Sequence, residues 1–219
     1  MNNCKNITSK TQTSSQTIYY KYRDFKNIEY LIDIFRKNEL HASTYDKLND
    51  PMEAFFNHKK LDKDLLEAIK TEKLKNKIVS LSKSYNNILI WTHYADEHRG
   101  IVMGVTIDAK DDLVIKPIIY QKDLHFFENK DSDCIESFAQ KVLTSKLCPW
   151  SYEEEVRVLT TSNTVIIKIK KIYFGIRTPK NYIDMIKKYC VPSEIECEYM
   201  THDNLNKEFG FRNFTKEEK

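Results

Sequence analysis

The chain has 219 residues, of which 41% are hydrophobic and 12% aromatic, enough for one domain with a substantial core. Charged residues make up 31% of the sequence, but the formal net charge is only +3, which gives no strong expectation of a nucleic-acid or membrane partner. The four glycines form no phosphate-binding pattern, which excludes a P-loop and a dinucleotide-binding fingerprint.

The cysteines and the N-terminal residues indicate the cellular compartment of the protein. Five cysteines are scattered with no C-x-x-C pair, and their odd number fits reduced thiols better than a disulfide framework. Residues 1–16 are polar and lack the apolar run of a signal peptide, and no stretch approaches the length of a membrane span. We therefore expect a cytoplasmic protein with a disordered tail over residues 1–16 and a single domain over residues 17–219.

The first quarter of the chain predicts a strand, a helix and a second strand. Residues 18–23 are aromatic and alternating, which is typical of a strand. Apolar residues then recur at helical spacing, so we expect a helix over Asp24–Lys37 with Asp24 as its N-cap. A short strand over residues 40–43 and a turn over residues 48–53 follow, since an Asp–Pro pair favours a turn.

The remaining three quarters mix helices and strands without strict βαβ order, which indicates an α+β domain. Helices are predicted over residues 61–76, 87–98, 135–147 and 179–189, and Gly100 is expected to end the second of these. Strands are predicted over residues 78–82, 100–108, 113–120, 155–161, 165–172 and 195–199. The strands over 155–161 and 165–172 are expected to form a hairpin with its turn at residues 162–163.

The segment Trp150–Arg157 carries the most specific functional signal. In an extended strand, residues two apart point to the same face, so Glu153 and Glu155 would lie side by side with Arg157 next in the row. Two adjacent carboxylates repel each other unless a cation or a polar ligand offsets the repulsion. The segment therefore points to a site for a ligand with hydroxyl groups or developing positive charge. The alternative is an exposed strand with a Glu–Arg ion pair.

Two other strands carry weaker signals. Lys21, Tyr22 and Arg23 end the first strand, where Arg23 could clamp a phosphate or a carboxylate; the alternative is a solvated edge strand. Ser80 and Ser82 share one face of a middle strand and could orient a sugar or a catalytic carboxylate. A polar outer face of the sheet would explain the same two serines.

The predicted helix over residues 87–98 places Trp91, Tyr94 and His98 on one face. Packing would explain Trp91 and Tyr94, whereas His98 is a candidate site residue. His93 and His98 are five residues apart, a spacing that does not suit two metal ligands on one helix face, and the cysteines have no ligand spacing either. We therefore expect no metal site.

Taken together, these motifs resemble domain-of-unknown-function family 2971, a bacterial family. The resemblance runs from about residue 18 to residue 177 and depends on the order and spacing of the motifs. The matching residues are Tyr20–Arg23, Leu48–Pro51, Glu53, Ser80–Ser82, Trp91–Ala95, His98, Gly100, Lys146, Trp150, Glu153, Glu155, Arg157 and Gly175.

More loosely, the chain is similar to mono-ADP-ribosyltransferases of the arginine–serine–glutamate type. These carry an arginine on the first strand, a Ser-x-Ser on a middle strand and a Glu-x-Glu on a later one. Here Arg23, Ser80–Ser82 and Glu153–Glu155 occur in that order. The resemblance implies a mixed split β-sheet flanked by helices. It also implies NAD as a substrate bound without a glycine-rich loop, which agrees with the scarcity of glycine.

This second resemblance also implies roles for individual residues. Glu155 would stabilise the cationic ribose, and Glu153 would orient or deprotonate the acceptor. Arg23 would hold a phosphate, and Ser80 would position the catalytic glutamate or the ribose. Tyrosine or tryptophan rings would stack on nicotinamide. The further candidates for NAD binding are Lys21, Tyr22, Ser82, Trp91, His93, Tyr94, His98, Trp150 and Arg157.

The leading hypothesis is thus an NAD-dependent ADP-ribosyltransferase-like enzyme that acts as a toxin or an anti-phage defence effector. Its partners would be a protein or nucleic-acid acceptor and a neutralising antitoxin or defence-system protein. One alternative is a non-catalytic ligand-sensing or protein-interaction module. Another is a nuclease in which Asp50, Glu53, Glu153 and Glu155 hold a divalent metal.

Overall fold

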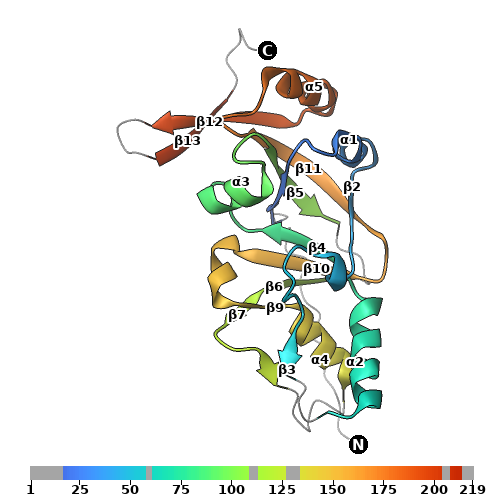
Figure 1. Ribbon diagram of the computed structural model, residues 1–219. Coiled ribbons are helices and arrows are strands. Elements are labelled where there is room, and N and C mark those ends of the chain that lie inside the picture. Colours follow the sequence, from blue (N-terminus) through green and yellow to red (C-terminus); the bar gives the residue numbers. More distant parts are fainter. Residues whose placement is uncertain (1–16, 58–60, 109–112, 127–133, 204–207, 214–219) are drawn as a thin grey trace, which may run out of the picture.

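The computed structural model describes residues 17–57, 61–108, 113–126, 134–203 and 208–213, so the predicted tail over residues 1–16 lies outside it. Within these residues the protein is a mixed α+β domain built on a nine-stranded sheet (Figure 1). Eight strands lie in the order β13 (Glu208–Asn213), β12 (Glu196–Asp203), β11 (Thr164–Phe174), β5 (Ile101–Ile107), β1 (Tyr19–Arg23), β4 (Lys77–Ser82), β10 (Glu155–Thr160), β6 (Val114–Pro117). The ninth, β2 (Glu39–His41), pairs with the start of β11.

Neighbouring strands of this sheet are antiparallel, except that β11 and β12 run parallel. All seven residues of β5 are buried, as expected for a central strand covered on both faces. Two parallel strand pairs lie outside the sheet. They are β3 (Phe56–Asn57) with β8 (His125–Phe126), and β7 (Ile119–Gln121) with β9 (Ser145–Leu147).

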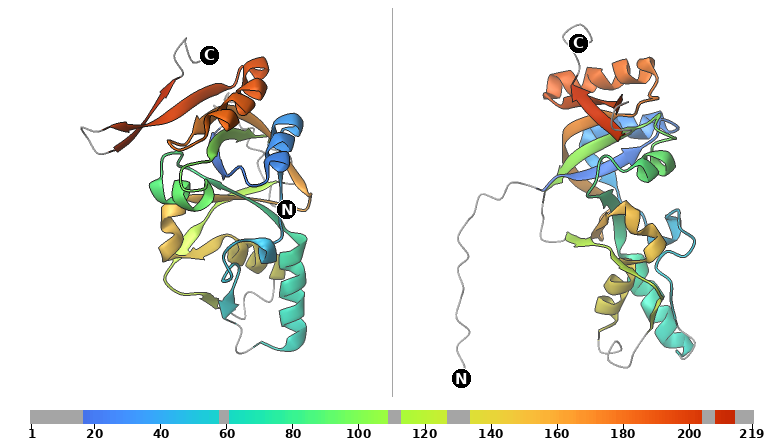
Figure 2. Two further views of the ribbon diagram at one scale, coloured as in Figure 1. Left: turned by 45° about the horizontal axis from the view of Figure 1, so that its top comes forward. Right: turned by 90° about the vertical axis from the view of Figure 1, so that its left-hand side faces the viewer.

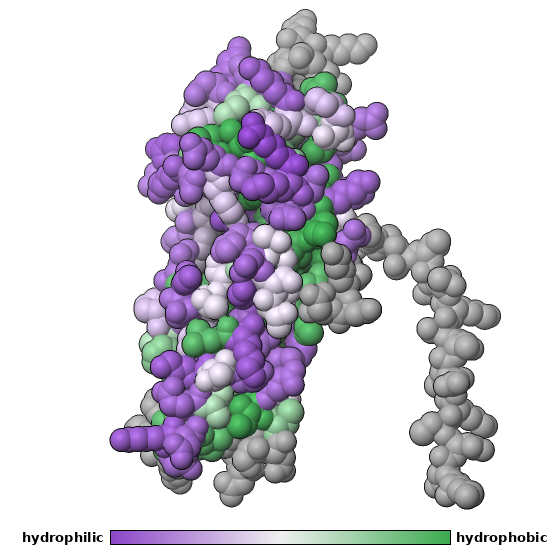
Figure 3. All heavy atoms as spheres, turned by 90° about the vertical axis from the view of Figure 1, so that its right-hand side faces the viewer, coloured by the Kyte–Doolittle hydropathy of each residue, from purple (hydrophilic) through white to green (hydrophobic). Residues whose placement is uncertain are grey.

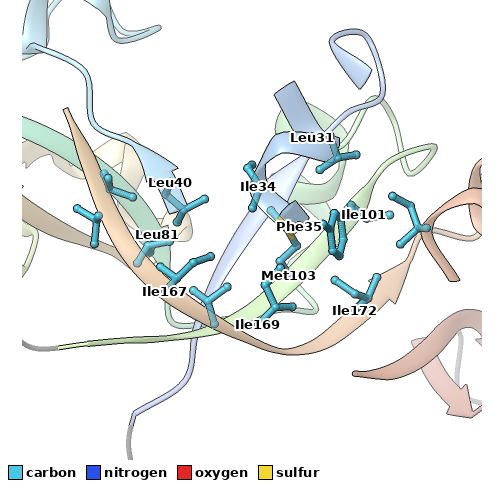
Figure 4. Packing of buried hydrophobic residues seen from close by; sticks show 14 of the residues in the cluster. Leu31, Ile34, Phe35, Leu40, Leu81, Ile101, Met103, Ile167, Ile169 and Ile172 are labelled. Atoms are coloured by element: carbon cyan, nitrogen blue, oxygen red, sulfur yellow. The ribbon is translucent and has the colours of Figure 1, made fainter. Parts of the chain in front are cut away.

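Two helices cover one face of the sheet. α1 (Ile28–Lys37) and α5 (Lys180–Cys190) contribute to one hydrophobic cluster with β5 and β11. Figure 4 shows Leu31 and Ile34 of α1 pointing toward Met103 of β5 and Ile169 of β11. Ile183 of α5 belongs to the same cluster. The apolar stripes predicted for these two helices are thus the surfaces that bind them to the sheet.

A shorter helix, α3 (Ile88–Tyr94), covers the opposite face. Trp91 is fully buried there against Tyr22 of β1 and Val102 of β5. Val102 and Met103 are consecutive, so their side chains lie on opposite faces of the sheet and in different clusters. The Trp91 indole N–H donates to the carbonyl of Tyr85 at 2.8 Å, which fixes α3 on the strand-to-helix loop.

A third cluster forms where α2 (Lys63–Lys75) packs against α4 (Ile135–Leu143), with Ile78 of β4 and Leu159 of β10 beneath them. The molecule is elongated, with α1, α3 and α5 around one end of the sheet and α2 and α4 at the other (Figure 2). Three 3-10 turns complete the described elements: η1 (Tyr45–Lys47), η3 (Cys148–Glu153) and η4 (Val191–Ser193).

The sheet is split between β1 and β4. These two strands pair at a single position, Tyr20 with Ser82, whereas β1 pairs with β5 at five positions and β4 with β10 at six. Beyond that position the strands separate. At the far end of the gap, Ser43 bridges to Ile78 through two backbone hydrogen bonds of 3.0 and 2.8 Å. Between these two contacts, no strand among the described residues pairs with this side of β4, so polar backbone groups of β4 face the gap.

The predicted N-cap of the first helix is wrong. α1 begins at Ile28 and is capped by Asn27, whose side chain accepts from the backbone N–H of Tyr30 at 3.2 Å. The carboxylate of Asp24 instead accepts from the backbone N–H of Lys26 at 3.1 Å, which makes a local turn before the helix. The start of the helix therefore lies one turn later than predicted, and Asp24 stays with the end of β1.

The predicted hairpin over residues 155–172 is also wrong. β10 and β11 follow each other in the chain, but β10 pairs with β4 and β6 while β11 pairs with β5, β12 and β2. The turn at residues 161–163 therefore carries the chain away from β10 to the other half of the sheet. The last strand, predicted over residues 195–199, extends to Asp203 as β12, and the chain adds β13, which was not predicted.

Two other predicted helices end about one turn earlier than expected. The one after β4 ends at Tyr94, and Asp96, Glu97 and His98 then adopt positive φ angles of 48°, 52° and 68°. Gly100 is not a left-handed cap; instead, a Cβ there would lie 2.2 Å from the carbonyl oxygen of Arg23. This close approach holds the loop after α3 against β1.

The other shortened helix is α4, which ends at Leu143 instead of residue 147. The hydroxyls of Thr144 and Ser145 donate to the carbonyls of Gln140 and Lys141 at 2.8 and 2.6 Å, which satisfies the last turn. Residues 145–147 then form β9, which turns Lys146 toward the space beside β10.

The surface shown in Figure 3 is mostly hydrophilic, with hydrophobic side chains gathered in smaller patches. None of the helices in the described part of the chain is long and apolar enough to cross a membrane.

Candidate functional site

A cavity of about 440 Å³ opens beside the split between β1 and β4. Its walls come from β1, β4, α3, β10, the region from Asp50 to Glu53, and Lys146 of β9. All but three of the predicted site residues line it, and they are Lys21, Tyr22, Arg23, Ser80, Ser82, His93, Tyr94, Glu153, Glu155 and Arg157. The split therefore brings together residues that are far apart in the sequence.

The acidic end of this cavity is a buried cluster of five charged side chains: Glu53, Lys146, Glu153, Glu155 and Arg157. Arg157 has no exposed surface and forms ion pairs with Glu53 and Glu155, at 2.7 and 2.9 Å. The Lys146 ammonium lies 2.7 Å from Glu153 and 2.8 Å from Glu155. Three carboxylates therefore share two cations, which leaves one surplus negative charge when all five are ionised.

Glu153 and Glu155 reach this cluster from two different elements, which corrects the expectation of one continuous strand. Glu153 ends the 3-10 turn η3, and Glu154 adopts a left-handed conformation with φ of 45°. β10 begins only at Glu155, so the two carboxylates do not form an i, i+2 row. They converge because Lys146 lies between them. Glu154, between them in the chain, is exposed.

The electrostatics of the cluster keep Glu155 ionised. Burial alone would raise the pKa of Glu155, but the charges of Arg157 and Lys146 together outweigh burial and hold the pKa at about 2. The pKa of Lys146 is raised despite burial, because the carboxylates of Glu155 and Glu153 are close. Burial, followed by its hydrogen bond to Glu153, raises the pKa of Tyr94, so its hydroxyl stays protonated and donates to that carboxylate.

Two hydroxyl groups fix the backbone around these glutamates. The Ser82 hydroxyl donates to the carbonyl of Glu153 at 2.8 Å and accepts from the backbone N–H of Ser84 at 3.0 Å. The backbone N–H of Glu155 donates to the Tyr120 hydroxyl at 2.8 Å. Ser82 is therefore a positioning residue for Glu153, and Tyr120 is one for Glu155.

The basic end of the cavity holds Lys21 and Arg23, which lie two residues apart on β1. The Lys21 ammonium donates to the carbonyl of Ser80 at 2.7 Å, across the split. Arg23 donates to the Tyr30 hydroxyl at 3.3 Å, and its guanidinium lies 5.0 Å from the centre of that ring. Within the described parts of the chain, neither cation forms an ion pair with a carboxylate, and the buried Arg23 Nε has no hydrogen-bond partner. This end is suited to an anion.

Burial of the two cations outweighs the nearby acidic groups in their pKa values. Burial, followed by the nearby charge of Arg23, lowers the pKa of Lys21 from 10.5 to about 7. Burial also lowers the pKa of Arg23. An anion bound between the two would favour their charged forms and raise both pKa values.

Lys21 should make the stability of the protein depend on pH. Because its folded pKa is below its unfolded pKa, the unfolded state binds more protons between about pH 7 and 10.5, and stability rises with pH across this window. A Lys21→Met variant lacks this dependence. We expect the stability of this variant relative to the unmodified protein to fall by about 2 kcal/mol from pH 7 to pH 9, as measured by urea unfolding. An unchanged difference would show that the pKa of Lys21 is not lowered.

Three predicted site residues lie outside the cavity lining. Trp91 is fully buried in the core, and His98 stacks on it with ring centroids 5.9 Å apart. Gly175 makes room for this arrangement, since a Cβ there would lie 2.2 Å from the His98 carbonyl oxygen. The half-buried Trp150 ring lies 5.2 Å from the Lys146 ammonium and forms a cation–π contact with it. Trp91 and His98 are thus packing residues in this structure.

Sequence reasoning assigned no role at the site to Tyr30 and Tyr120, and it gave Lys146 a place only through a family resemblance. Tyr30 reaches Arg23 from α1, and its hydroxyl also accepts from the backbone N–H of His41 at 3.2 Å. No local pattern marks such a residue, because its role depends on how α1 packs beside β2.

The carboxylates do not favour the nuclease hypothesis. Glu53, Glu153 and Glu155 already bind Lys146 and Arg157, and Asp50 accepts from the backbone N–H of Met52 at 2.8 Å in its turn. Among the described residues, no group of three or more His, Cys, Asp or Glu side chains is placed to hold a metal ion. The cavity therefore offers separate basic and acidic ends.

No protein-family model, no curated protein and no solved structure matches the chain.

Proposed function

We propose that this protein is an NAD-dependent ADP-ribosyltransferase-like enzyme. The observation that carries the proposal is the opposite charge at the two ends of one cavity. Among the described residues, Lys21 and Arg23 form no ion pair with a carboxylate, and the buried cluster around Glu155 has one carboxylate more than its cations balance. NAD joins a diphosphate to a ribose that becomes cationic as nicotinamide leaves, so its two parts suit these two ends.

The acidic end would stabilise the transition state. As the bond between nicotinamide and ribose breaks, positive charge develops on the ribose, and a fixed negative charge in a water-excluded site lowers its energy. Glu155 makes three contacts, with Arg157 Nε and Nη2 and with Lys146, which leaves acceptor capacity on a carboxylate with about four lone-pair positions. In this role Glu155 would accept a ribose hydroxyl. Glu153, bound by Tyr94 and Lys146, has more capacity left and would take the proton of the acceptor.

The basic end would hold the diphosphate. An arginine can donate to a phosphate through several N–H groups, and Arg23 has an unused Nε. The cavity of about 440 Å³ lies within the range of roughly 300–1,000 Å³ that is usual for ligand sites. His93 and Tyr94 line the cavity beside Glu153 and are the rings best placed to stack on nicotinamide.

The resemblance of Arg23, Ser80–Ser82 and Glu153–Glu155 to the arginine–serine–glutamate transferases supports the same reaction. The acceptor would be a protein or a nucleic acid, and the biological role that of a toxin or an anti-phage defence effector in the cytoplasm. An activity of that kind requires control, so a neutralising antitoxin or defence-system partner is part of the proposal.

A second candidate is a ligand-sensing module that binds the same molecule without turnover. The observation that favours it is the tight pairing of Glu155, whose two oxygens both contact cations and whose pKa is held at about 2. A carboxylate held in this way is rigid and weakly basic. The two candidates differ in whether bound NAD is cleaved.

Binding of NAD to the purified protein, measured by titration calorimetry, tests the proposal. We expect Arg23→Gln to weaken binding at least about tenfold, because it removes a charge-assisted hydrogen bond to phosphate. The matched control is Arg36→Gln, since Arg36 is exposed on α1 and does not line the cavity. Equal effects of the two substitutions, or no binding by the unmodified protein, would show that the basic end does not bind NAD.

A further inference from the structure

Lys21 differs from the other largely buried lysines of the structure in what surrounds its amine. Lys146 lies among three carboxylates. Lys73 is outside the cavity, where its ammonium donates to the carbonyl of Ala54 and lies 4.3 Å from the centre of the Tyr45 ring. Lys21 lines the cavity, and the only hydrogen bond of its amine among the described residues is to the carbonyl of Ser80.

The surroundings of Lys21 favour the neutral amine. Burial in the split and the neighbouring guanidinium of Arg23 both disfavour the ammonium form, and they lower the pKa of Lys21 to about 7 when no anion is bound. A lysine that is desolvated or placed beside another cation is the type that attacks carbonyl carbons. Besides Arg23, the charged groups that line the cavity are Asp24, Lys47, Asp50, Glu53, Lys146, Glu153, Glu155 and Arg157, and the carboxylate of Glu155 partly opposes the lowering of the Lys21 pKa.

Arg23 is positioned to bind an anion next to this amine. It follows Lys21 by two residues on the same strand, so the two side chains point to the same side of β1. Its Nε is buried without a hydrogen-bond partner among the described residues, and both side chains line one cavity. A neutral amine and a phosphate-binding guanidinium therefore face the same space.

We propose that Lys21 is a nucleophile that forms an imine with a phosphorylated aldehyde, whose phosphate is bound by Arg23. The amine nitrogen bonds to the aldehyde carbon, and the carbonyl oxygen leaves as water with the two protons of the amine. No oxidant or reductant takes part. Open-chain sugar phosphates and the free ribose end of ADP-ribose belong to this class of ligand, but the reaction does not depend on cleavage of NAD.

The reactive lysine can be identified with pyridoxal 5′-phosphate, a phosphorylated aldehyde, followed by borohydride reduction and peptide mapping of the full chain. We expect the label on Lys21 at low reagent concentration near pH 7. Lys21→Arg keeps the positive charge but cannot form the imine, so it should lose this label. The matched control is Lys47→Arg, because Lys47 also lines the cavity but is exposed, and this variant should keep the label on Lys21.

The role of the phosphate is tested by a second arm with pyridoxal, which has the aldehyde but no phosphate. We expect labelling of Lys21 by pyridoxal to need at least about tenfold more reagent, and Arg23→Gln to reduce the preference for the phosphorylated reagent. The peptide map of the labelled, unmodified protein tests whether Lys21 is the reactive lysine even if a variant fails to fold. Label spread over exposed lysines, label on Lys47, or equal labelling by the two reagents would overturn the proposal. None of these results depends on whether NAD is bound or cleaved.

Discussion

The Glu155→Gln variant is expected to cleave NAD at least about a hundredfold more slowly than the unmodified protein, because an electrostatic contribution to a charged transition state is lost. Glutamine has nearly the shape of glutamate but carries no charge. The substitution would leave the acidic end of the cavity with two carboxylates and two cations, and hence no surplus negative charge. Release of nicotinamide from NAD measures this rate.

Glu154→Gln is the control for this prediction, since Glu154 is exposed and lies between the two buried glutamates. It should retain full activity. The Glu155→Gln substitution preserves the shape of the side chain but weakens its ion pairs. Because Glu155 binds Arg157 and Lys146, some stability should be lost, and the rate must be measured where the variant is fully folded. Full activity of Glu155→Gln under those conditions would show that the carboxylate is structural.

The Arg157→Met variant is expected to lose about 3–5 kcal/mol of unfolding free energy, the usual cost of removing one partner from a buried ion pair. Arg157 has no exposed surface, binds Glu53 and Glu155, and donates to the carbonyl of Leu143 at 2.6 Å. Its removal leaves three buried carboxylates with Lys146 alone. Arg36→Met on the exposed face of α1 is the control and should change stability by less than about 0.5 kcal/mol.

The effect of Arg157→Met should depend on pH. In the unmodified protein the pKa of Glu155 is depressed to about 2, so Glu155 contributes stability that is fully present above its unfolded pKa and is lost as the pH falls toward 2. The difference between the unmodified protein and the variant should therefore be largest above about pH 5 and smaller at lower pH. A difference that stays constant from pH 7 to pH 3 would mean that the loss comes from packing and not from charge.

Local patterns in the sequence identified the helices and strands that have a clear apolar face. The apolar spacing from Ile28 to Phe35 matches the face of α1 that packs on the sheet, and the alternation over residues 18–23 matches β1. Strand pairing was not predictable in the same way. β10 and β11 are adjacent in the chain, but β11 has eleven residues and crosses to the other half of the sheet to meet β5 and β12. Nothing in the turn between β10 and β11 encodes that choice.

The candidate site was predictable where one strand carries several of its residues. Lys21 and Arg23 on β1, and Ser80 and Ser82 on β4, face the cavity as the sequence suggested. Glu153 and Glu155 converge for a reason that the sequence does not contain, which is the position of Lys146 between them. Tertiary packing alone determines such a contact, so it becomes visible only in the structure.

The split between β1 and β4 is the feature on which the account depends, because it creates one cavity with a basic and an acidic end. The most direct test is incubation of the purified protein with adenine-labelled NAD and a cell lysate, followed by separate recovery of protein and nucleic acid. We expect release of nicotinamide and transfer of the label to one of these two fractions, with both lost in Glu155→Gln and retained in Glu154→Gln. Intact NAD and unlabelled fractions after incubation with the folded, unmodified protein would contradict it.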